Sequence, residues 1–403
     1  MKKILLSVAA LLLCLALTSC GAVKKIIYVL TGVGGTDTTA AETFETVTYV
    51  PSDESEEFSP RIPEDGMPYY DTVTRYAWQT LDSTGKADYY TVLEAALGFA
   101  SSVTVQSQDP SYIWECVFFD TPELFYLDER ADVSGQTLTF RYAFDRETAA
   151  GMARELDLAY SDFIASGGDR ASDVFDRVLF LYEYIINRTR YNDRADEDYE
   201  KDVYNDAVYR AICAAGPLLD GSSICIGYAR ATQYLAQRLG IQTFTVKGRG
   251  NSGPHYYCLV NFDGKYSYVD TTWGDPVSSD RSKDYLTYYY FGMTTEDLLF
   301  SHEIRTRVPL PVCTATEYNY FIHNNLTADS AKEIARRAFD NYQKGINETL
   351  LHVDRLKIND IYDDMWAELR NEVETRGLTD SAVGYGLIKS YDSSVIGVVF
   401  HND

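Results

Sequence analysis

Basic residues are scarce in this 403-residue chain, where 36 Lys and Arg stand against 60 Asp and Glu and the formal net charge is −24. A surface that binds nucleic acid needs clustered positive charge, so this balance argues against DNA or RNA as a partner. Histidine is also rare, with five residues, and neither HExxH nor any other paired metal-ligand spacing occurs. We therefore expect no metal and no cofactor.

The N-terminus lacks an apolar run long enough to cross a membrane. Ile4 to Leu17 is apolar but shorter than the roughly 20 residues that such a helix needs. The run follows two lysines and ends in the tetrapeptide LTSC at Cys20, which resembles the lipobox of bacterial lipoprotein precursors. This resemblance implies a signal peptide at 1–19, a lipidated Cys20, and export to the bacterial cell envelope, where the lipid anchors the chain in the membrane. The alternative is a plain transmembrane anchor.

The most informative stretch is Gly221 to Pro276, which places a cysteine at the start of a predicted helix. Ser222 and Ser223 are candidate N-caps, and Gly240 is a candidate C′ residue. Cys225 therefore falls in the first turn, where N–H groups and the helix dipole favour a thiolate. The positions expected on one stripe of this helix are Tyr228, Ala231, Thr232, Leu235 and Leu239.

A strand and then a β-hairpin follow this helix. Two aromatic and β-branched runs, 256–262 and 265–270, flank an Asp-Gly pair that is typical of a two-residue type I′ turn. That turn pairs Tyr257 with Asp270 and leaves His255 diagonal to Asp270 on the same face, roughly 7–8 Å away at the backbone. A four-residue loop would place His255 directly opposite Asp270, and only an odd-length loop would separate their faces.

A thiol at a helix start, a histidine and an aspartate that orients the histidine are the groups that cysteine-dependent acyl transfer requires. Three segments carry them: CIGYARA at Cys225, GPHYYCLV at His255 and YSYVDTTWGDP at Asp270. Together they resemble the bacterial transglutaminase-like superfamily, whose members are relatives of papain-like cysteine peptidases. The resemblance covers about 169–307 and implies that Cys225 is the nucleophile, His255 the base and Asp270 the orienting residue.

The chain departs from this family pattern at two places. His255 is followed by Tyr-Tyr-Cys where the family often has Ala-Trp-Asn, and Ile226 stands where a polar residue is frequent. Both departures concern the surface that would face a substrate. Tyr228 and Tyr257 are candidates to line the substrate cleft, with core packing as the simpler interpretation.

Seven cysteines occur in the chain. Cys14 is expected to leave with the signal peptide and Cys20 to be lipidated, so five remain, and they show no paired metal-ligand spacing. Cys225 must stay reduced to act as a nucleophile. The simplest interpretation of the other four is that they are buried apolar residues: Cys116, Cys213, Cys258 and Cys313. Because the chain is expected to be exported, a disulfide among these four is an alternative.

The predicted fold is α+β, with a papain-like or transglutaminase-like core in which the cysteine-bearing helix packs on an antiparallel sheet. Residues 31–60 are rich in Gly, Thr, Ser and acid, so we expect 20–60 to be the lipid anchor followed by a flexible tether. We expect the core at 146–325, between small α+β units at 61–145 and 326–403. The segment DTPELFY at 120–126 resembles one often found upstream of transglutaminase-like domains in bacterial surface proteins.

Apolar periodicity predicts further elements. The acidic run 193–202 is expected to be a loop, and His302 is expected to be a solvated surface residue. Helices are expected at 89–100, 152–163 and 174–186, with a break at Gly167-Gly168, strands at 138–144 and 285–291, and a hairpin of 383–388 with 395–400.

These observations predict a surface cysteine hydrolase or transferase that acts on peptide or amide bonds through a thioester. Its substrate would be a peptide, a protein or a cell-wall peptide, and the sequence leaves hydrolysis and crosslinking open. The alternative is a non-catalytic module that keeps the fold and binds peptide or glycan through tyrosine-rich surfaces, which the 33 tyrosines would suit. The C-terminal unit would dock a partner protein or complete the cleft.

Overall fold

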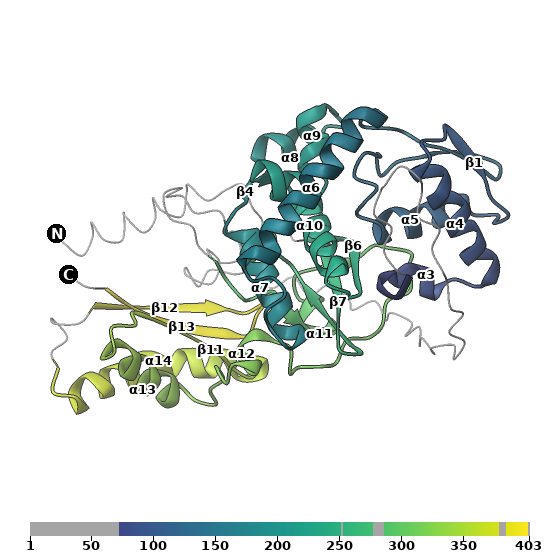
Figure 1. Ribbon diagram of the computed structural model, residues 1–403. Coiled ribbons are helices and arrows are strands. Elements are labelled where there is room, and N and C mark those ends of the chain that lie inside the picture. Colours follow the sequence, from purple (N-terminus) through teal and green to yellow (C-terminus); the bar gives the residue numbers. More distant parts are fainter. Residues whose placement is uncertain (1–71, 251–252, 277–285, 379–383, 402–403) are drawn as a thin grey trace. The chain divides into compact units, whose positions relative to one another are not determined.

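The computed structural model describes residues 72–250, 253–276, 286–378 and 384–401 (Figure 1). The expected signal peptide at 1–19, the lipidated Cys20 and the tether at 20–60 lie outside the described residues. Within those residues, no helix has both the length and the apolar character that crossing a membrane requires. They form two compact units: a larger unit of 72–290 and 302–315, and a smaller unit of 291–301 and 316–401.

The first half of the larger unit is mainly helical (Figure 1). A small antiparallel sheet has the strand order β1 (Ser102–Thr104), β3 (Thr137–Thr139), β2 (Asp132–Ser134), and β4 (Arg190–Tyr191) pairs in parallel with β5 (Ser222–Ser223). The helices are η1 (Thr72–Thr74), α3 (Tyr76–Thr80), α4 (Ser83–Leu97), α5 (Pro110–Asp120), α6 (Arg146–Ser166), α7 (Val174–Ile186), α8 (Asp193–Glu200), α9 (Asp206–Ala211), η2 (Gly216–Asp220) and α10 (Cys225–Arg238).

The second half of the larger unit is an antiparallel sheet against which α10 packs. Its strands follow the order β10 (Glu303–Ile304), β6 (Thr243–Gly250), β7 (Gly253–Phe262), β8 (Lys265–Val269). Helix α10 is buried from Cys225 to Gln237 on all its faces. The cysteine-bearing helix thus lies on an antiparallel sheet.

The two long helices follow their predicted periodicity. Asp145 and Asp173 cap α6 and α7 by accepting hydrogen bonds from backbone N–H groups of the first turn. Gly167 ends α6 with a φ of +119°, a left-handed conformation that favours glycine. The predicted break between the helices is therefore confirmed, with a glycine C-cap as its physical cause.

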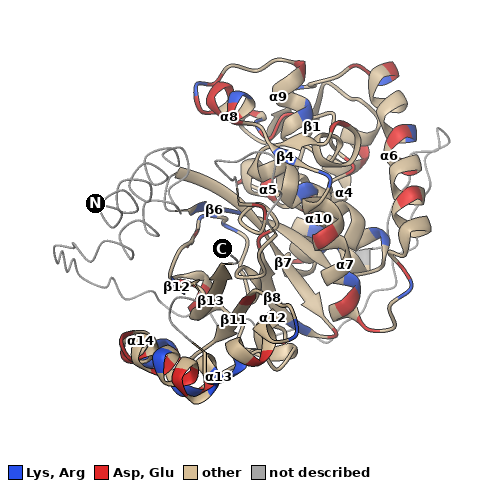
Figure 2. Ribbon diagram, turned by 90° about the vertical axis from the view of Figure 1, so that its left-hand side faces the viewer, with Lys and Arg blue, Asp and Glu red and all other residues tan. Residues whose placement is uncertain are grey.

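The acidic run 193–202 was expected to be a loop, and this prediction is wrong, because α8 occupies most of it. Asn192 caps the helix by accepting from the N–H of Ala195 at 2.9 Å. Asp193 and Asp196 lie in the first turn, where the helix dipole favours negative charge. Figure 2 shows the acidic residues gathered on this helix.

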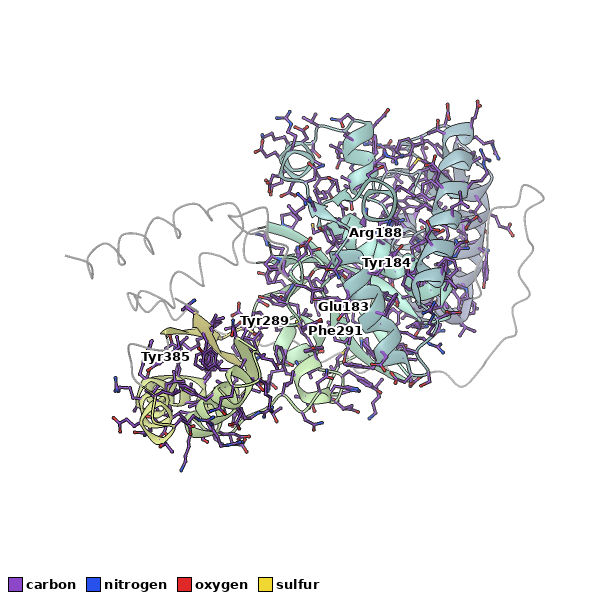
Figure 3. The ribbon with its side chains drawn as sticks, turned by 60° about the vertical axis from the view of Figure 1, so that its left-hand side comes forward. Glu183, Tyr184, Arg188, Tyr289, Phe291 and Tyr385 are labelled. Carbon is purple, nitrogen blue, oxygen red and sulfur yellow. The ribbon has the colours of Figure 1, made fainter. Side chains whose placement is uncertain are left out.

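The two predicted strands 138–144 and 285–291 are also largely wrong. Only Thr137–Thr139 and Phe291–Met293 are strands, as β3 and β9. Residues 287 and 288 instead bond to α7: the hydroxyl of Tyr182 donates to the carbonyl of Thr287 at 2.7 Å, and that of Tyr288 donates to Glu183 at 2.6 Å. Figure 3 labels Glu183 on α7. These residues are therefore held by side-chain hydrogen bonds with α7 instead of by backbone hydrogen bonds to a neighbouring strand.

A buried polar network joins the end of α5 to α10. Gln233 and Gln237 donate to the carbonyls of Phe119 and Asp120 at 2.7 and 3.0 Å. Arg230, completely buried, donates to the carbonyls of Phe118 and Thr121 at 2.9 and 3.1 Å. Buried carbonyls need such donors, which explains the polar residues on a helix that is otherwise packed in apolar surroundings.

The segment 120–126 closes this network. Glu123, buried, pairs with the guanidinium of Arg75 at 3.0 Å, and Arg75 also donates to Gln237 at 2.5 Å. The segment thus contributes carbonyls and a carboxylate that anchor the back of α10. Residues 72–145 and the cysteine-bearing helix accordingly share one buried interior.

The smaller unit has its own core between a sheet and two helices. The predicted hairpin of 383–388 with 395–400 is confirmed as β12 and β13, from Gly384 to His401. Both units combine helices and sheets, so the α+β prediction is confirmed. The strand order of its sheet is β11 (Glu348–His352), β13 (Val395–His401), β12 (Gly384–Ser390). Its helices are α11 (Thr295–Leu298), α12 (Tyr320–His323), α13 (Ala331–Tyr342), η3 (Arg355–Lys357) and α14 (Ile358–Thr375).

Candidate functional site

The β7–β8 hairpin has the register that its turn predicts. Asp263 and Gly264 have φ angles of +51° and +91°, as a type I′ turn requires. Cys258 pairs with Val269, and Phe262 pairs with Lys265, which is the register predicted for a two-residue turn. His255 and Asp270 are therefore brought to one face of the sheet, and Cys258 points to the other, where its thiol donates to the carbonyl of Ala229 at 3.2 Å.

Asp270 is fully buried and has four hydrogen-bond donors around its carboxylate. Oδ1 accepts from the backbone N–H groups of Thr272 and Trp273 at 2.9 and 3.1 Å. Oδ2 lies 2.7 Å from His255 Nε2 and 3.0 Å from His302 Nε2. Burial raises the pKa of Asp270, but the charges and hydrogen bonds of the two histidines hold it well below its usual range. The carboxylate is therefore ionised.

An ionised carboxylate can only accept hydrogen bonds, so His255 carries a proton on Nε2. That leaves Nδ1 as the ring nitrogen available to Cys225, a neighbour that raises the pKa of His255. Burial lowers the pKa of His255, but the charge of Asp270, the hydrogen bond to Asp270 and the neighbouring Cys225 raise it to about 10. The ring of His255 is thus a cation at neutral pH.

Cys225 is the first residue of α10 and is 4% exposed. The predicted N-caps Ser222 and Ser223 are wrong, because Ile224 is the N-cap and supplies no side-chain bond. Ser222 and Ser223 form β5 instead, and the hydroxyl of Ser223 donates to the carbonyl of Ala211 at 2.7 Å. The predicted end is confirmed, since Gly240 follows the helix with a φ of +77°. The sulfur sits at the positive end of the helix dipole.

Gly227, two residues after Cys225 in α10, has no room for a side chain. A Cβ there would lie 2.1 Å from Ser223 Oγ and 2.2 Å from the carbonyl oxygen of Ala211. Alanine gains about 1 kcal/mol in helix propensity over glycine, whereas overpacking typically costs about 1–3 kcal/mol. We expect Gly227→Ala to lower the free energy of unfolding in urea titrations. The matched control is Gly151→Ala in α6, where the nearest atom is 4.0 Å away; equal stabilisation by both changes would contradict the packing argument.

Tyr228 and Tyr257, the candidates for the substrate cleft, are both buried. The hydroxyl of Tyr228 donates to Asp275 at 2.5 Å, and that of Tyr257 donates to the carbonyl of Glu303 at 3.1 Å. The ring of Trp273 lies tilted against that of His255, with 5.0 Å between the centroids. These aromatic side chains keep water away from the His255–Asp270 bond, which strengthens it.

His302 was expected to be a solvated surface residue, and this prediction is wrong. Its side chain is completely buried, with the ring centroid 4.3 Å from that of Trp273. The antiparallel pairing of β10 with β6 places the residue there, since Glu303 pairs with Arg249. No local pattern around His302 announces this long-range pairing, so the sequence offered no signal for it.

His255, Asp270 and His302 each offer one atom that could ligate a metal, all within 4.8 Å of one another. Within the described part of the chain no other such group of three occurs. Both rings and the carboxylate are already engaged in hydrogen bonds with each other. An ion bound through these same atoms would have to replace those hydrogen bonds.

The raised pKa of His255 makes stability depend on pH. The pKa of a histidine is near 6.5 in the unfolded chain, whereas that of His255 is about 10 in the folded protein. The ion pair of His255 with Asp270 therefore contributes fully to the free energy of unfolding below pH 6.5, and this contribution is lost as the pH rises toward 10. One proton of difference gives a slope of about 1.4 kcal/mol per pH unit. We expect urea titrations of the wild type to show this alkaline decline and His255→Gln to lack it. A slope of the same size in both proteins would contradict the assignment.

The chain has no match among protein-family models and no match among curated proteins. One solved structure that is similar to it is described as the crystal structure of a TGase, at 18% sequence identity and a TM-score of 0.28. The match covers 48% of this chain and 48% of that one, so the chain spans about half the length of its structural neighbour. At so low a TM-score the likeness does not establish a common fold, and it assigns no residue a role.

Proposed function

We propose that this protein is a cysteine-dependent acyl-transfer enzyme that acts on peptide or amide bonds, with Cys225, His255 and Asp270 as its catalytic triad. The observation that carries the proposal is that Cys225, at the start of α10, lies beside a His255 ring whose Nε2 is 2.7 Å from Asp270 Oδ2. Each residue comes from a different element: the start of α10, β7, and the turn after β8. Such an arrangement activates a sulfur nucleophile.

In the first step the sulfur of Cys225, reacting as a thiolate paired with the cationic ring, attacks the carbonyl carbon of an amide. His255 then gives its Nδ1 proton to the leaving nitrogen, the C–N bond breaks, and a thioester with an amine product results. Asp270 keeps the ring oriented and stabilises its positive charge. The backbone N–H of Cys225, at the helix start, would bind the developing oxyanion.

In the second step the neutral ring of His255 removes a proton from the incoming water or amine. The new bond to the acyl carbon forms as the bond to sulfur breaks, and the thiolate returns. Water gives a carboxylic acid, and a primary amine gives a new amide. Both outcomes use the same three residues, so the fate of the thioester depends on what reaches the site.

The substrate class we propose is a peptide, a protein or a cell-wall peptide. It follows from the N-terminal lipoprotein pattern at Cys20, which would hold the enzyme at the bacterial cell envelope. Net charge of −24 makes an anionic polymer such as nucleic acid a poor partner.

A second function, a binding module without catalysis, is favoured by one observation. Cys225 is 4% exposed and His255 is 6% exposed, so a substrate carbonyl must displace neighbouring atoms to reach the sulfur. A protein that retained the fold but binds peptide or glycan elsewhere would show such a closed site. The two functions differ in whether Cys225 forms a covalent bond.

Acylation by p-nitrophenyl acetate separates the two functions. The catalytic account predicts a burst of about one nitrophenolate per chain and an acetyl group on Cys225, located by mass spectrometry of the digested protein. The burst is expected to vanish in Cys225→Ala and to persist in Cys258→Ala, whose sulfur lies on the opposite face of β7. Absence of any acetyl-Cys225 from the wild type would leave the binding module as the better account.

Cadaverine added after the burst then distinguishes the two outcomes of the thioester. Faster loss of the acetyl group, with acetyl-cadaverine as the product, identifies a transferase. Loss at the same rate, with acetate as the product, identifies a hydrolase.

A further inference from the structure

His302 has no part in the three-residue mechanism, yet its ring contacts the same carboxylate oxygen as His255. The distance from His302 Nε2 to Asp270 Oδ2 is 3.0 Å, against 2.7 Å for His255. The side chains of His302 and Asp270 are both completely buried. A buried hydrogen bond to a charge is strong, so this contact is a built feature of the site rather than a chance approach.

We propose that His302 is a positioning residue: it donates its ring N–H to Asp270 Oδ2 and thereby limits how strongly that oxygen attracts the proton of His255. The proposal rests on the proposed function, since it concerns the same carboxylate. One oxygen that accepts two N–H donors shares its negative charge between them. Removing one donor leaves more charge for the other.

The tautomer of His302 follows from the acceptor. Asp270 is ionised and can only accept, so His302 must carry a proton on Nε2, whatever the state of its other nitrogen. In both states the ring stabilises the carboxylate, and the pKa of Asp270 is held down by His302 as well as by His255. Loss of His302 therefore raises the proton affinity of Asp270 and, through the shared proton, the pKa of His255.

The other titratable groups that face this cluster stay neutral near pH 7. Tyr182 from α7, and Tyr257 and Cys258 from β7, all have pKa values raised by burial and by the charge of Asp270. The ring of Tyr290 packs against His302 at 5.9 Å between centroids. Cys225 and, from α8, Asp196 also interact with His255.

The position of His302 explains why a histidine suits this place. Its ring lies tilted against that of Trp273, with 4.3 Å between centroids, and meets Tyr257 edge-on at 5.0 Å, so a flat ring fits this space as well as supplying a donor. Phenylalanine keeps the ring and removes the donor. Glutamine removes the ring and keeps an N–H at the distance of Nε2.

The test uses the full chain labelled with [15N]histidine, which contains five imidazoles. We expect two ring N–H signals protected from exchange with solvent, those of His255 and His302. His302→Phe should remove one of them, shift the signal of His255 to lower field, and raise the midpoint of the His255 titration by about half a pH unit or more. His302→Gln should leave the signal and titration of His255 close to those of the wild type.

His352→Gln is the matched control, because His352 is a partly buried histidine of β11 in the smaller unit. It should leave both protected signals unchanged. An unaltered His255 signal and titration in a folded His302→Phe protein would overturn the proposal and leave His302 as a packing residue. Should the phenylalanine variant fail to fold, His302→Asn serves instead, because its shorter side chain cannot reach Asp270 and the same shifts are expected.

Two further outcomes are decisive. About one equivalent of a divalent metal in the purified wild type, lost in both His255→Ala and His302→Ala, would show a metal site and overturn the proposal. Failure of Cys225 to become acylated would overturn the proposed function alone, since the ring N–H signals report on His302 without any reaction at sulfur.

Discussion

Iodoacetamide is expected to alkylate Cys225 on the order of a hundred times faster than the other cysteines of the described residues at pH 7. All five of these thiols are buried, so access alone does not select one of them. Burial raises the pKa of Cys116, Cys213 and Cys258, which disfavours their thiolates. Cys225 instead contacts a cationic imidazole at a helix start. Charge rather than exposure should therefore decide the rate.

His255→Ala should bring the alkylation rate of Cys225 down to that of the other buried thiols, because the cation that favours the thiolate is gone. His323→Ala is the control, since His323 is exposed on α12. It should leave the rate unchanged. Rates are measured by quenching at timed intervals and quantifying each alkylated cysteine by mass spectrometry. A Cys225 rate equal to that of Cys116 in the wild type would contradict the account.

Asp270→Asn is expected to lower the free energy of unfolding by about 3–5 kcal/mol, the usual cost of breaking a buried ion pair. The amide places two N–H donors beside groups that are themselves donors, namely two histidine rings and two backbone N–H groups. At least one of these bonds must be lost, and the cationic ring of His255 loses its counter-charge. The same change should slow alkylation of Cys225 by at least about tenfold.

Asp275→Asn provides the comparison for this effect. Asp275 accepts a hydrogen bond from the hydroxyl of Tyr228 at 2.5 Å, and an amide oxygen can replace that acceptor. Its expected cost is within about 1 kcal/mol, and the alkylation rate should not change. Urea titrations give the stabilities, and an Asp270→Asn protein as stable as Asp275→Asn would show that the four-donor arrangement does not form.

Local chemistry made the geometry of the hairpin predictable. The Asp-Gly turn fixes the register through its positive φ angles, and the register fixes the face of every residue on β7 and β8. This was enough to bring His255 and Asp270 together. The helix end at Gly240 could be read in the same way.

Long-range contacts made the rest unpredictable. His302 reaches Asp270 because β10 pairs with β6, more than fifty residues earlier in the chain, and two residues of pairing leave no periodicity to read. The two backbone donors to Asp270 arise from the turn after β8, where sequence alone does not set the direction of an N–H group. Arg230 and Gln237 on α10 are polar positions whose partners, at the end of α5, lie over a hundred residues away.

The sequence contains a cap signal for α8, but the acidic composition of 193–202 led to the prediction of a loop. Asn192 followed by acids is a helix-start signal, and acids in a first turn are favourable. The density of like charge in 193–202 suggested a solvated loop instead. Capping and dipole effects prevailed over repulsion among side chains that mostly reach solvent.

The central claim is that Cys225, His255 and Asp270 act as one unit, and a double-mutant cycle of alkylation rates tests it most directly. We predict that the protein carrying both His255→Ala and Asp270→Asn alkylates Cys225 no more slowly than His255→Ala alone, because Asp270 acts only through the ring of His255. Losses that multiply in the double variant would show that the two residues influence the sulfur independently, and would contradict the account.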